Sequence, residues 1–233
     1  IFAGKTMRLP LWVSSMTGGT QLAGGINRNL AQVCREFGMG MGLGSCRMLL
    51  DDATHLKDFD VRHIIGDEQP LYANLGICQL EKLLLANQIH RVSALVDSLK
   101  ADGVIIHVNP LQEAFQPEGD RLVHAPIDLI EWFLRETQLR VIVKEVGQGM
   151  GPQSLARLMM LPIEAIEFGA LGGTNFSLLE MMRHDEAFAE AMQPFASVGH
   201  SADEMLRDVN AFVAENSGVR CHQLIISGGI TSV

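Results

Sequence analysis

The sequence predicts a parallel α/β fold of the (β/α)8 TIM-barrel class. Apolar runs of strand length alternate with helical patterns along the chain, as in parallel sheets with helical crossovers. Six of the seven apolar runs are followed by a polar, glycine-rich or motif-bearing loop. Functional groups spread over so many strand ends favour a closed barrel, because an open doubly wound sheet concentrates its site at one switch point.

Seven segments have the near-continuous hydrophobicity of strands that are buried on both faces. They cover residues 9–16, 39–45, 70–75, 103–108, 140–146, 165–168 and 223–227. No eighth strand is visible, and 233 residues fall just below the roughly 250 of a typical barrel. We therefore expect a single barrel domain over residues 1–233, with the eighth strand and an amino-terminal segment absent from this chain.

Helical patterns lie between most of these strands. They cover residues 26–37, 80–100, 126–136 and 152–160, the last with Pro152 in a first-turn position. The segment 178–216 is expected to hold two helices, because Pro194 and Gly199 interrupt it. Ser201 is expected to cap the second of them.

Composition excludes several classes of protein. With 47% hydrophobic and 19% charged residues, the chain is globular and can bury one substantial core. No apolar run approaches the roughly 20 residues of a membrane span, so a cytoplasmic location is expected. A net charge of −9 argues against nucleic acid as a partner and means that any anionic ligand must be held by local groups. The four cysteines form no CxxC pair, so neither zinc nor a disulfide framework is indicated.

Four polar side chains follow the apolar strand at 103–106, in the heptapeptide His107-Val-Asn-Pro-Leu-Gln-Glu113. His107, Asn109 and Gln112 are neutral hydrogen-bonding groups. Glu113 is an oxygen ligand of the kind Mg²⁺ prefers when it also bridges a diphosphate. In the alternative interpretation this is a plain loop, in which His107 and Asn109 cap the strand and turn; four polar residues with Pro110 fixing the turn favour a site.

Two glycine loops follow the last two strands, namely Gly172-Gly-Thr174 and Ser227-Gly-Gly-Ile230. Barrels commonly bind phosphate near their final strands, and backbone N–H groups exposed by glycine can hold phosphate without adding net charge. A simple strand-to-helix turn explains Ser227–Ile230 equally well.

Two cations stand out beside the strands. Lys144 lies in an otherwise apolar strand, where an ammonium is costly unless it meets an anion or a polar cavity. A structural salt bridge to Glu145 or Glu167 is the alternative to a functional role. Arg47 follows the second strand and offers a bidentate fork for phosphate, although it could equally be a surface arginine.

Together with Met16-Thr-Gly-Gly19, Gly44-Ser-Cys-Arg47, Ala73-Asn-Leu-Gly76 and Val143-Lys-Glu-Val-Gly147, these motifs resemble one family in order over nearly the whole chain. The family is the type 2 isopentenyl diphosphate isomerase, an FMN-linked TIM barrel. The resemblance implies interconversion of isopentenyl and dimethylallyl diphosphate in isoprenoid biosynthesis. It also implies reduced FMN, Mg²⁺, NADPH as the reductant, and a homotetramer or homo-octamer.

The resemblance assigns roles to individual residues. It implies that Gln112, Lys144 and His107 serve catalysis and that Glu113 holds the metal. Substrate contacts are implied for Arg47, His107, Asn109 and Gln112. Cofactor contacts are implied for Met16, Thr17, Ser45, Asn74, Lys144, Thr174, Gly228 and Gly229.

Chemical reasoning points to a cofactor as well. The allylic shift needs one proton delivered to an unactivated alkene and another removed nearby. No side chain in the sequence is an obvious acid of that strength, so a cofactor must carry the difficult step while the protein supplies position and charge.

Two departures from the family pattern keep alternatives open. Cys46 stands where the family has glutamine, and Thr231 stands where it usually has a basic residue. One alternative is therefore a homologue that has lost catalytic activity and binds either flavin or no cofactor. A second alternative is another FMN-dependent barrel enzyme, such as a hydroxy-acid oxidase. Such an enzyme would need a histidine base and paired arginines, which the heptapeptide does not provide.

Overall fold

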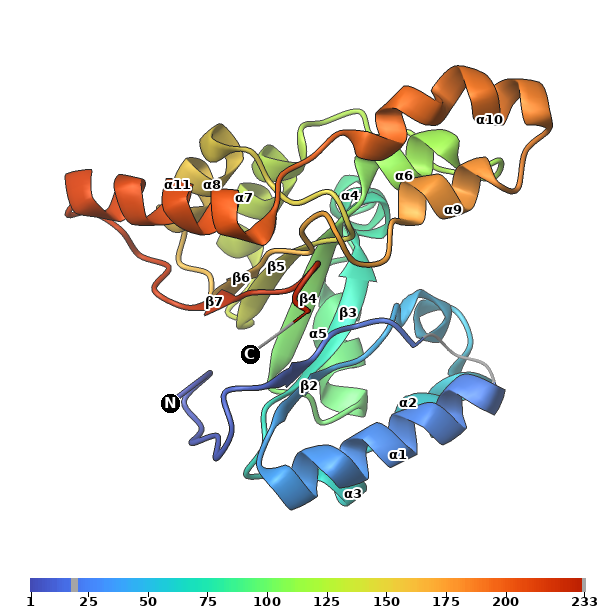
Figure 1. The fold of residues 1–233 in the computed structure, drawn as a ribbon. Helices are drawn as coiled ribbons and strands as arrows, with labels where there is room; N and C mark the ends of the chain where they lie inside the picture. The colour runs from blue at the N-terminus through green and yellow to red at the C-terminus, as the bar shows by residue number, and fades with distance from the viewer. Residues whose placement is uncertain (18–20, 232–233) are drawn as a thin grey trace. The chain divides into compact units, whose positions relative to one another are not determined.

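The computed structural model describes residues 1–17 and 21–231, and Figure 1 shows its fold. Gly18 and Gly19 of the first glycine motif lie outside the described residues. By its internal contacts the chain forms two compact units, which we describe separately. Unit 1 combines Ile1–Ile106 with Trp132–Ile142, and unit 2 combines His107–Glu131 with Val143–Val233. That residues 1–233 form a single domain stays a prediction.

Every predicted strand segment contains a strand. The strands are β1 (Trp12–Val13), β2 (Gly40–Gly42), β3 (Leu71–Gly76), β4 (Gly103–Val108), β5 (Val141–Glu145), β6 (Ala165–Glu167) and β7 (Leu224–Ile225). The hydrogen-bonded parts of β1, β2 and β7 are shorter than their apolar runs, whose ends continue as irregular chain.

The strands pair in the order of the sequence. In unit 1, β1 pairs with β2 and β2 with β3 in parallel, with Trp12 opposite Gly40 and Met41 opposite Leu71. In unit 2, β6 pairs with β7 in parallel, with Ile166 opposite Leu224. Sequential parallel strands separated by helices are the pattern of a (β/α)8 barrel, of which the described residues supply seven strands. The predicted fold class is confirmed.

The helices of unit 1 differ from the prediction in that the first begins at Gln21, the short helices between residues 47 and 65 were not predicted, and residues 80–100 hold two helices. They are α1 (Gln21–Phe37), the short turns η1 (Arg47–Leu50) and η2 (Ala53–His55), α2 (Leu56–Phe59), α3 (Arg62–Ile65), α4 (Ile77–Leu85) and α5 (His90–Ser98). The single helix predicted at 80–100 was wrong, because α4 and α5 are separate. Asn87 between them has φ +55°, a left-handed conformation that asparagine tolerates and that cannot continue a helix.

In unit 2 the helices are more numerous than predicted. They are α6 (Pro110–Phe115), α7 (Pro126–Glu136, whose last turns belong to unit 1), α8 (Pro152–Met159), α9 (Phe176–Met181), α10 (Glu186–Met192), η3 (Gln193–Ser197) and α11 (Ala202–Glu215). Two helices were predicted at 178–216, but Asp185 starts a further one by accepting a hydrogen bond from the Phe188 N–H at 2.9 Å. Ser201 caps α11 in a capping box with Glu204, as predicted.

Each unit buries its own apolar side chains. In unit 1, Met41, Phe59 and Tyr72 are fully buried around the strands. In unit 2, α8 and α11 pack together, and Met159 and Met205 are buried there. A smaller cluster of Phe115, Met181 and Ala196, with Leu111, Phe188 and Met192 against it, joins α6, α9, α10 and η3. This cluster anchors the helix that carries Gln112 and Glu113.

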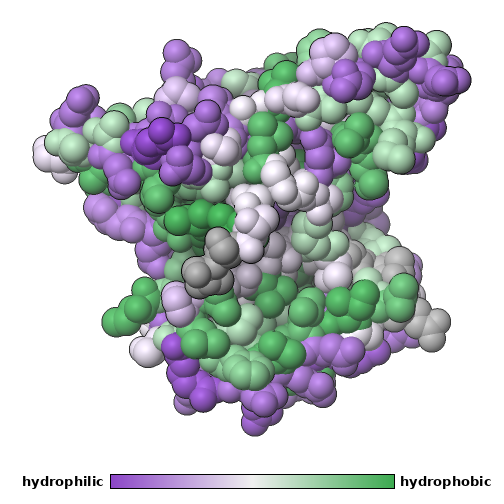
Figure 2. Space-filling model, in the orientation of Figure 1, coloured by the Kyte–Doolittle hydropathy of each residue, from purple (hydrophilic) through white to green (hydrophobic). Residues whose placement is uncertain are grey.

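The surface of unit 1 carries exposed apolar residues. Four of them lie along α1, namely Leu22, Ile26, Val33 and Phe37. Figure 2 shows hydrophobic residues gathered on the visible face of this unit. No helix in the described part of the chain combines the length and apolarity needed to cross a membrane.

Candidate active site

The heptapeptide begins with the last two residues of β4 and continues into the first turn of a helix, so it is not the plain loop of the alternative interpretation. Pro110 occupies the first turn of α6, where its missing N–H costs nothing. Asn109 stands at the N-cap position, but its side chain does not cap the helix. Its Nδ2 instead donates to Gln112 Oε1 at 3.2 Å and to Glu113 Oε1 at 3.1 Å. The spacing i, i+3 and i+4 therefore brings all three polar side chains to one face.

Gln112 is held at both ends of its amide. Its Oε1 accepts from Asn109, and its Nε2 donates to Glu180 Oε1 on α9 at 3.1 Å. Glu180 is 6% exposed and forms an ion pair with Arg183, whose guanidinium also pairs with Glu118. These contacts fix which way the amide of Gln112 points.

Sequence reasoning missed Glu180. It lies 68 residues from Gln112, and no motif joins the two. A signal was present, however, because Glu180 stands among Leu178, Leu179, Met181 and Met182. A carboxylate in such an apolar run is costly without a partner, for the reason that drew attention to Lys144.

Glu113 is 9% exposed, and both of its oxygens are engaged. Oε1 accepts from Asn109 Nδ2, and Oε2 accepts from the Asp120 N–H at 2.8 Å. No group of three or more His, Cys, Asp or Glu side chains that could hold a metal ion occurs among the described residues. Glu113 would offer a metal one carboxylate, with ligand phosphate and water needed to complete its coordination, an arrangement typical of Mg²⁺.

An unsatisfied acceptor lies beside Glu113. Asn109 Oδ1 is buried and has no hydrogen-bond partner within the described ranges. A buried acceptor without a donor is costly, so a ligand or metal at this place would relieve it. His107 precedes this group at the end of β4 and is half-buried, with a contact of its own to the surrounding chain.

Lys144 near the end of β5 is 4% exposed, and its Nζ donates to the backbone oxygen of Glu145 at 2.7 Å. The salt bridge to Glu145 or Glu167 considered above stays an alternative to a functional role. A buried ammonium has three protons to place, and an anionic or polar ligand could take those that the Glu145 carbonyl does not.

The carboxylate of Glu145 organises the loop after β5. Its Oε2 accepts hydrogen bonds from the N–H groups of residues 146–149 at 2.6 to 3.0 Å. Gly147 and Gly149 permit this wrapping, because their φ angles are +134° and +68°. Burial raises the pKa of Glu145, against the opposing effect of the four backbone donors.

The two glycine loops of unit 2 lie against each other. A Cβ placed on Gly172 would come within 2.9 Å of Gly229 Cα, and one on Gly173 within 3.3 Å of Gly228 Cα. Gly228 and Gly229 have φ angles of +91° and +72°. Thr174 is exposed at the end of the first loop. Glycine is therefore needed for the two backbones to pack together, and exposed N–H groups of such loops could hold a phosphate group.

The remaining predicted residues belong to unit 1. Thr17 Oγ1 donates to Asn27 Oδ1 on α1, and Met16 is 48% exposed beside it. Asn74 at the end of β3 is 2% exposed, and its backbone oxygen accepts from the Cys46 N–H at 2.8 Å. Ser45 Oγ is buried without a partner among the described residues, so it is open to a ligand. Arg47 begins η1 and is exposed.

Cys46, the departure from the family pattern, is fully buried. Its Sγ donates to the Gly44 carbonyl at 3.3 Å, and burial raises the pKa of the thiol to about 12. The side chain is therefore a neutral thiol at neutral pH. All four cysteines are buried, and none forms a disulfide.

Known proteins resemble this chain over most of its length. No model of a known protein family matches it. A protein of Rickettsia peacockii (strain Rustic) is 41% identical over 182 residues, which make up 78% of this chain and 52% of that protein. A protein of Rickettsia typhi (strain ATCC VR-144 / Wilmington) is 35% identical over 99% of this chain and 65% of its own length. One of Mycolicibacterium gilvum (strain PYR-GCK) is 33% identical over 98% of this chain and 63% of its own length.

All three relatives are named isopentenyl-diphosphate delta-isomerase, and the chain spans between about half and two thirds of their length. Among solved structures, an old yellow enzyme homologue from Zymomonas mobilis covers 71% of this chain and 70% of its own, with a TM-score of 0.47 and 12% identity. We conclude nothing from this weak structural likeness. The sequence similarity to the isomerases of Rickettsia typhi and Mycolicibacterium gilvum, by contrast, extends over nearly the whole chain. The chain belongs to the family of the isopentenyl-diphosphate delta-isomerases.

Proposed function

We propose that the protein converts isopentenyl diphosphate to dimethylallyl diphosphate and is of the flavin-dependent type 2. The observation that carries this proposal is the connected polar face of Asn109, Gln112, Glu113 and Glu180 in unit 2. It joins an amide of fixed orientation to a carboxylate suited to a metal. Family membership supplies the substrate class, and the face supplies the groups that would orient it.

FMN is the proposed cofactor, with NADPH as its reductant. Bound reduced FMN would supply the acid and base for the two proton transfers. In unit 2, the Gly172–Gly173 and Gly228–Gly229 loops and Thr174 would hold its phosphate. Lys144 would place a positive charge against the ring system. In unit 1, the groups assigned to the ring and ribityl chain are Met16, Thr17, Ser45 and Asn74.

The substrate's charged end is assigned to Arg47 and to Mg²⁺ on Glu113. A protein of net charge −9 needs such local attraction for a diphosphate. His107 would donate to substrate oxygens. The Asn109 amide nitrogen already donates to Gln112 and Glu113, so the free acceptor Oδ1 is the atom that Asn109 would turn to the metal or to a water beside it. Gln112 would orient the reacting carbons, because a neutral amide is too weak an acid to protonate an alkene.

Homotetramer or homo-octamer assembly and a cytoplasmic location are proposed with the type 2 assignment. They rest on the family resemblance and, for location, on the composition.

An anaerobic assay tests the proposal and separates it from the alternatives. Full-length protein is incubated with FMN, NADPH, Mg²⁺ and isopentenyl diphosphate, and the product is identified by mass spectrometry. We expect dimethylallyl diphosphate, and no consumption of NADPH beyond that needed to reduce the flavin. A bound flavin spectrum without conversion would favour a lapsed homologue. Turnover of a 2-hydroxy acid with oxygen would favour an oxidase.

A further inference from the structure

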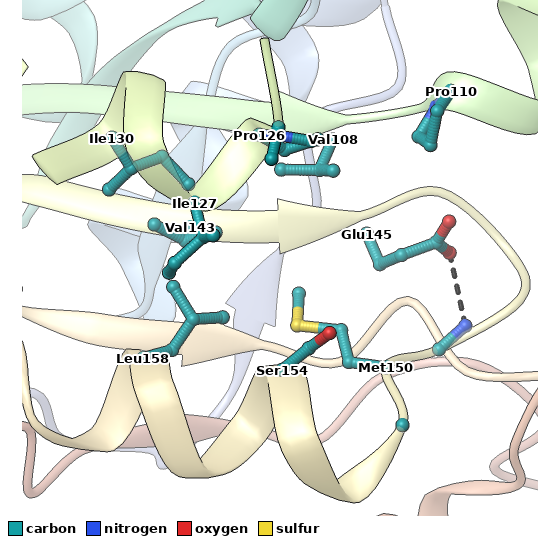
Figure 3. Close-up of a pocket in the computed structure, with 13 residues that line it drawn as sticks. Val108, Pro110, Pro126, Ile127, Ile130, Val143, Glu145, Met150, Ser154 and Leu158 are labelled. Carbon is teal, nitrogen blue, oxygen red and sulfur yellow. Dashed lines mark hydrogen bonds between the residues drawn. The ribbon is translucent and has the colours of Figure 1, made fainter.

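In each unit, a buried polar side chain holds the segment that follows a strand. In unit 2, Glu145 accepts hydrogen bonds from the N–H groups of residues 146–149, and Figure 3 shows its carboxylate turned towards that loop. In unit 1, Asn27 on α1 is 0% exposed and contacts Thr17, which follows β1. The sequence motifs and the proposed function give Asn27 no role.

The hydrogen bonds of Asn27 fix which end of its amide faces each neighbour. Its Nδ2 donates to the backbone oxygen of Asp58 on α2 at 2.9 Å. A carbonyl oxygen can only accept, so the amide cannot be turned round without losing this bond. Oδ1 therefore faces Thr17, and the Thr17 hydroxyl donates to it.

The packing of α1 against α2 allows this arrangement. Gly24 lies one turn before Asn27, on the same face of α1. A Cβ added to Gly24 would come within 2.7 Å of Asp58 Oδ1 and 3.2 Å of Asp58 Cα. Glycine thus lets the two helices approach closely enough for Asn27 to reach the Asp58 carbonyl. Asn27 therefore joins three segments of unit 1: the chain after β1, α1 and α2.

This network decides what Thr17 can offer a ligand. A threonine hydroxyl has one proton, and Thr17 donates it to Asn27. Towards a ligand its oxygen can then only accept a hydrogen bond. Phosphate and carbonyl oxygens are acceptors themselves and do not suit it. An N–H or O–H group does, and FMN carries both kinds, on its ring and on its ribityl chain.

We propose that Asn27 is a positioning residue for cofactor binding: it takes the Thr17 proton and so directs a lone pair of Thr17 Oγ1 to an N–H or O–H group of FMN. This inference rests on the proposed function, which assigns Thr17 to the ring and ribityl chain. Without Asn27 the hydroxyl can rotate, and its acceptor is no longer fixed in advance of binding.

A double-mutant cycle on the full-length protein tests the proposal, with FMN affinity measured by fluorescence quenching. Asn27→Leu and Thr17→Val are each expected to weaken FMN binding about tenfold. The double variant should lose no more than about tenfold in all, because both changes remove the same contact. Asn29→Leu, at an exposed position of the same helix, is the matched control and should keep full affinity. If Asn27→Leu does not fold, Asn27→Ala replaces it in the cycle.

Thr17→Ser provides the conservative rescue. It keeps the hydroxyl and should restore most of the affinity that Thr17→Val loses. Additive losses of about a hundredfold in the double variant, or full affinity in Asn27→Leu, would overturn this inference alone. A wild-type protein that binds no FMN would overturn the proposed function as well.

Discussion

Gln112 illustrates how much a single residue depends on its neighbours. Its amide can present either a donor or an acceptor to a substrate, and the Asn109 and Glu180 contacts decide which. Glu180 does not belong to the heptapeptide, so its role is to position Gln112. A substitution of Glu180 should therefore change the catalytic rate more than it changes ligand binding.

Glu180→Gln tests this positioning role. The neutral amide can donate as well as accept, so it no longer fixes the orientation of Gln112 Nε2. We expect kcat to fall about tenfold, equivalent to about 1.4 kcal/mol, with the KM for isopentenyl diphosphate and the flavin spectrum little changed. Glu190→Gln on the exposed side of α10 is the control and should leave kcat as it is. A rise in KM alone would assign Glu180 to binding.

Glu113→Gln tests the metal assignment. Losing the charged oxygen should raise the Mg²⁺ concentration for half-maximal activity at least about tenfold, because one protein carboxylate is the proposed anchor. Flavin absorbance should be preserved, since the glycine loops are untouched. Glu136→Gln at the exposed end of α7 is the matched control. An unchanged magnesium requirement would show that Glu113 does not bind the metal.

Glu145 gives a pH-dependent contribution to stability. Its pKa is raised by burial, so the native state binds this proton more tightly than the unfolded state, whose carboxyl titrates near about 4.3. The stability that protonation contributes is present below that value and is lost as pH rises through the higher native pKa. Urea unfolding from pH 4 to 8 should show a shallower decline for Glu145→Gln than for the wild type. Parallel curves would contradict the raised pKa.

At the scale of elements, the glycine loops after β6 and β7 depend on backbone that only glycine provides. A Cβ on Gly228 would lie 2.1 Å from the Ala170 carbonyl oxygen, at a φ of +91°. Gly228→Ala should therefore displace the loop and weaken FMN binding at least about tenfold, as measured by fluorescence quenching.

Gly25→Ala is the matched control for that change, because nothing lies within 4 Å of its added Cβ and it stands inside α1. It should stabilise the protein by about 0.5–1 kcal/mol without affecting FMN binding. FMN affinity that survives in Gly228→Ala would show that this loop does not hold the phosphate.

The strands were predictable from sequence because their apolar runs are short, nearly continuous and bounded by loops. The helices were less predictable where a single residue ends one helix and separates it from the next. Asn87 separates α4 from α5 through its backbone conformation, and the surrounding apolar periodicity does not reveal it. Pro110 was interpreted as a turn, although proline is equally compatible with the first turn of a helix.

The candidate site was predictable only in part for a similar reason. Residues within the heptapeptide could be grouped by their spacing, and the structure brings Asn109, Gln112 and Glu113 to one face. Glu180 could not be grouped with them, because its contact with Gln112 depends on how α9 packs against α6. Long-range pairs of this kind follow from tertiary packing and not from local pattern.

For the whole molecule, the central question is where the protons come from. The acidic chain offers orienting amides, one metal-suited carboxylate and a buried lysine, but no evident side-chain acid for an alkene. This distribution fits a protein that binds and orients while a reduced flavin supplies the proton chemistry. The isomerase activity should therefore depend on the redox state of the cofactor more than on any single side chain.

The most direct test is the rate of isopentenyl diphosphate conversion by full-length protein under anaerobic conditions, with FMN either oxidised or fully reduced and Mg²⁺ present in both. We predict conversion to dimethylallyl diphosphate with reduced FMN and none with oxidised FMN. Conversion at equal rates in both states or without flavin, or its absence with the reduced flavin bound, would contradict this mechanism.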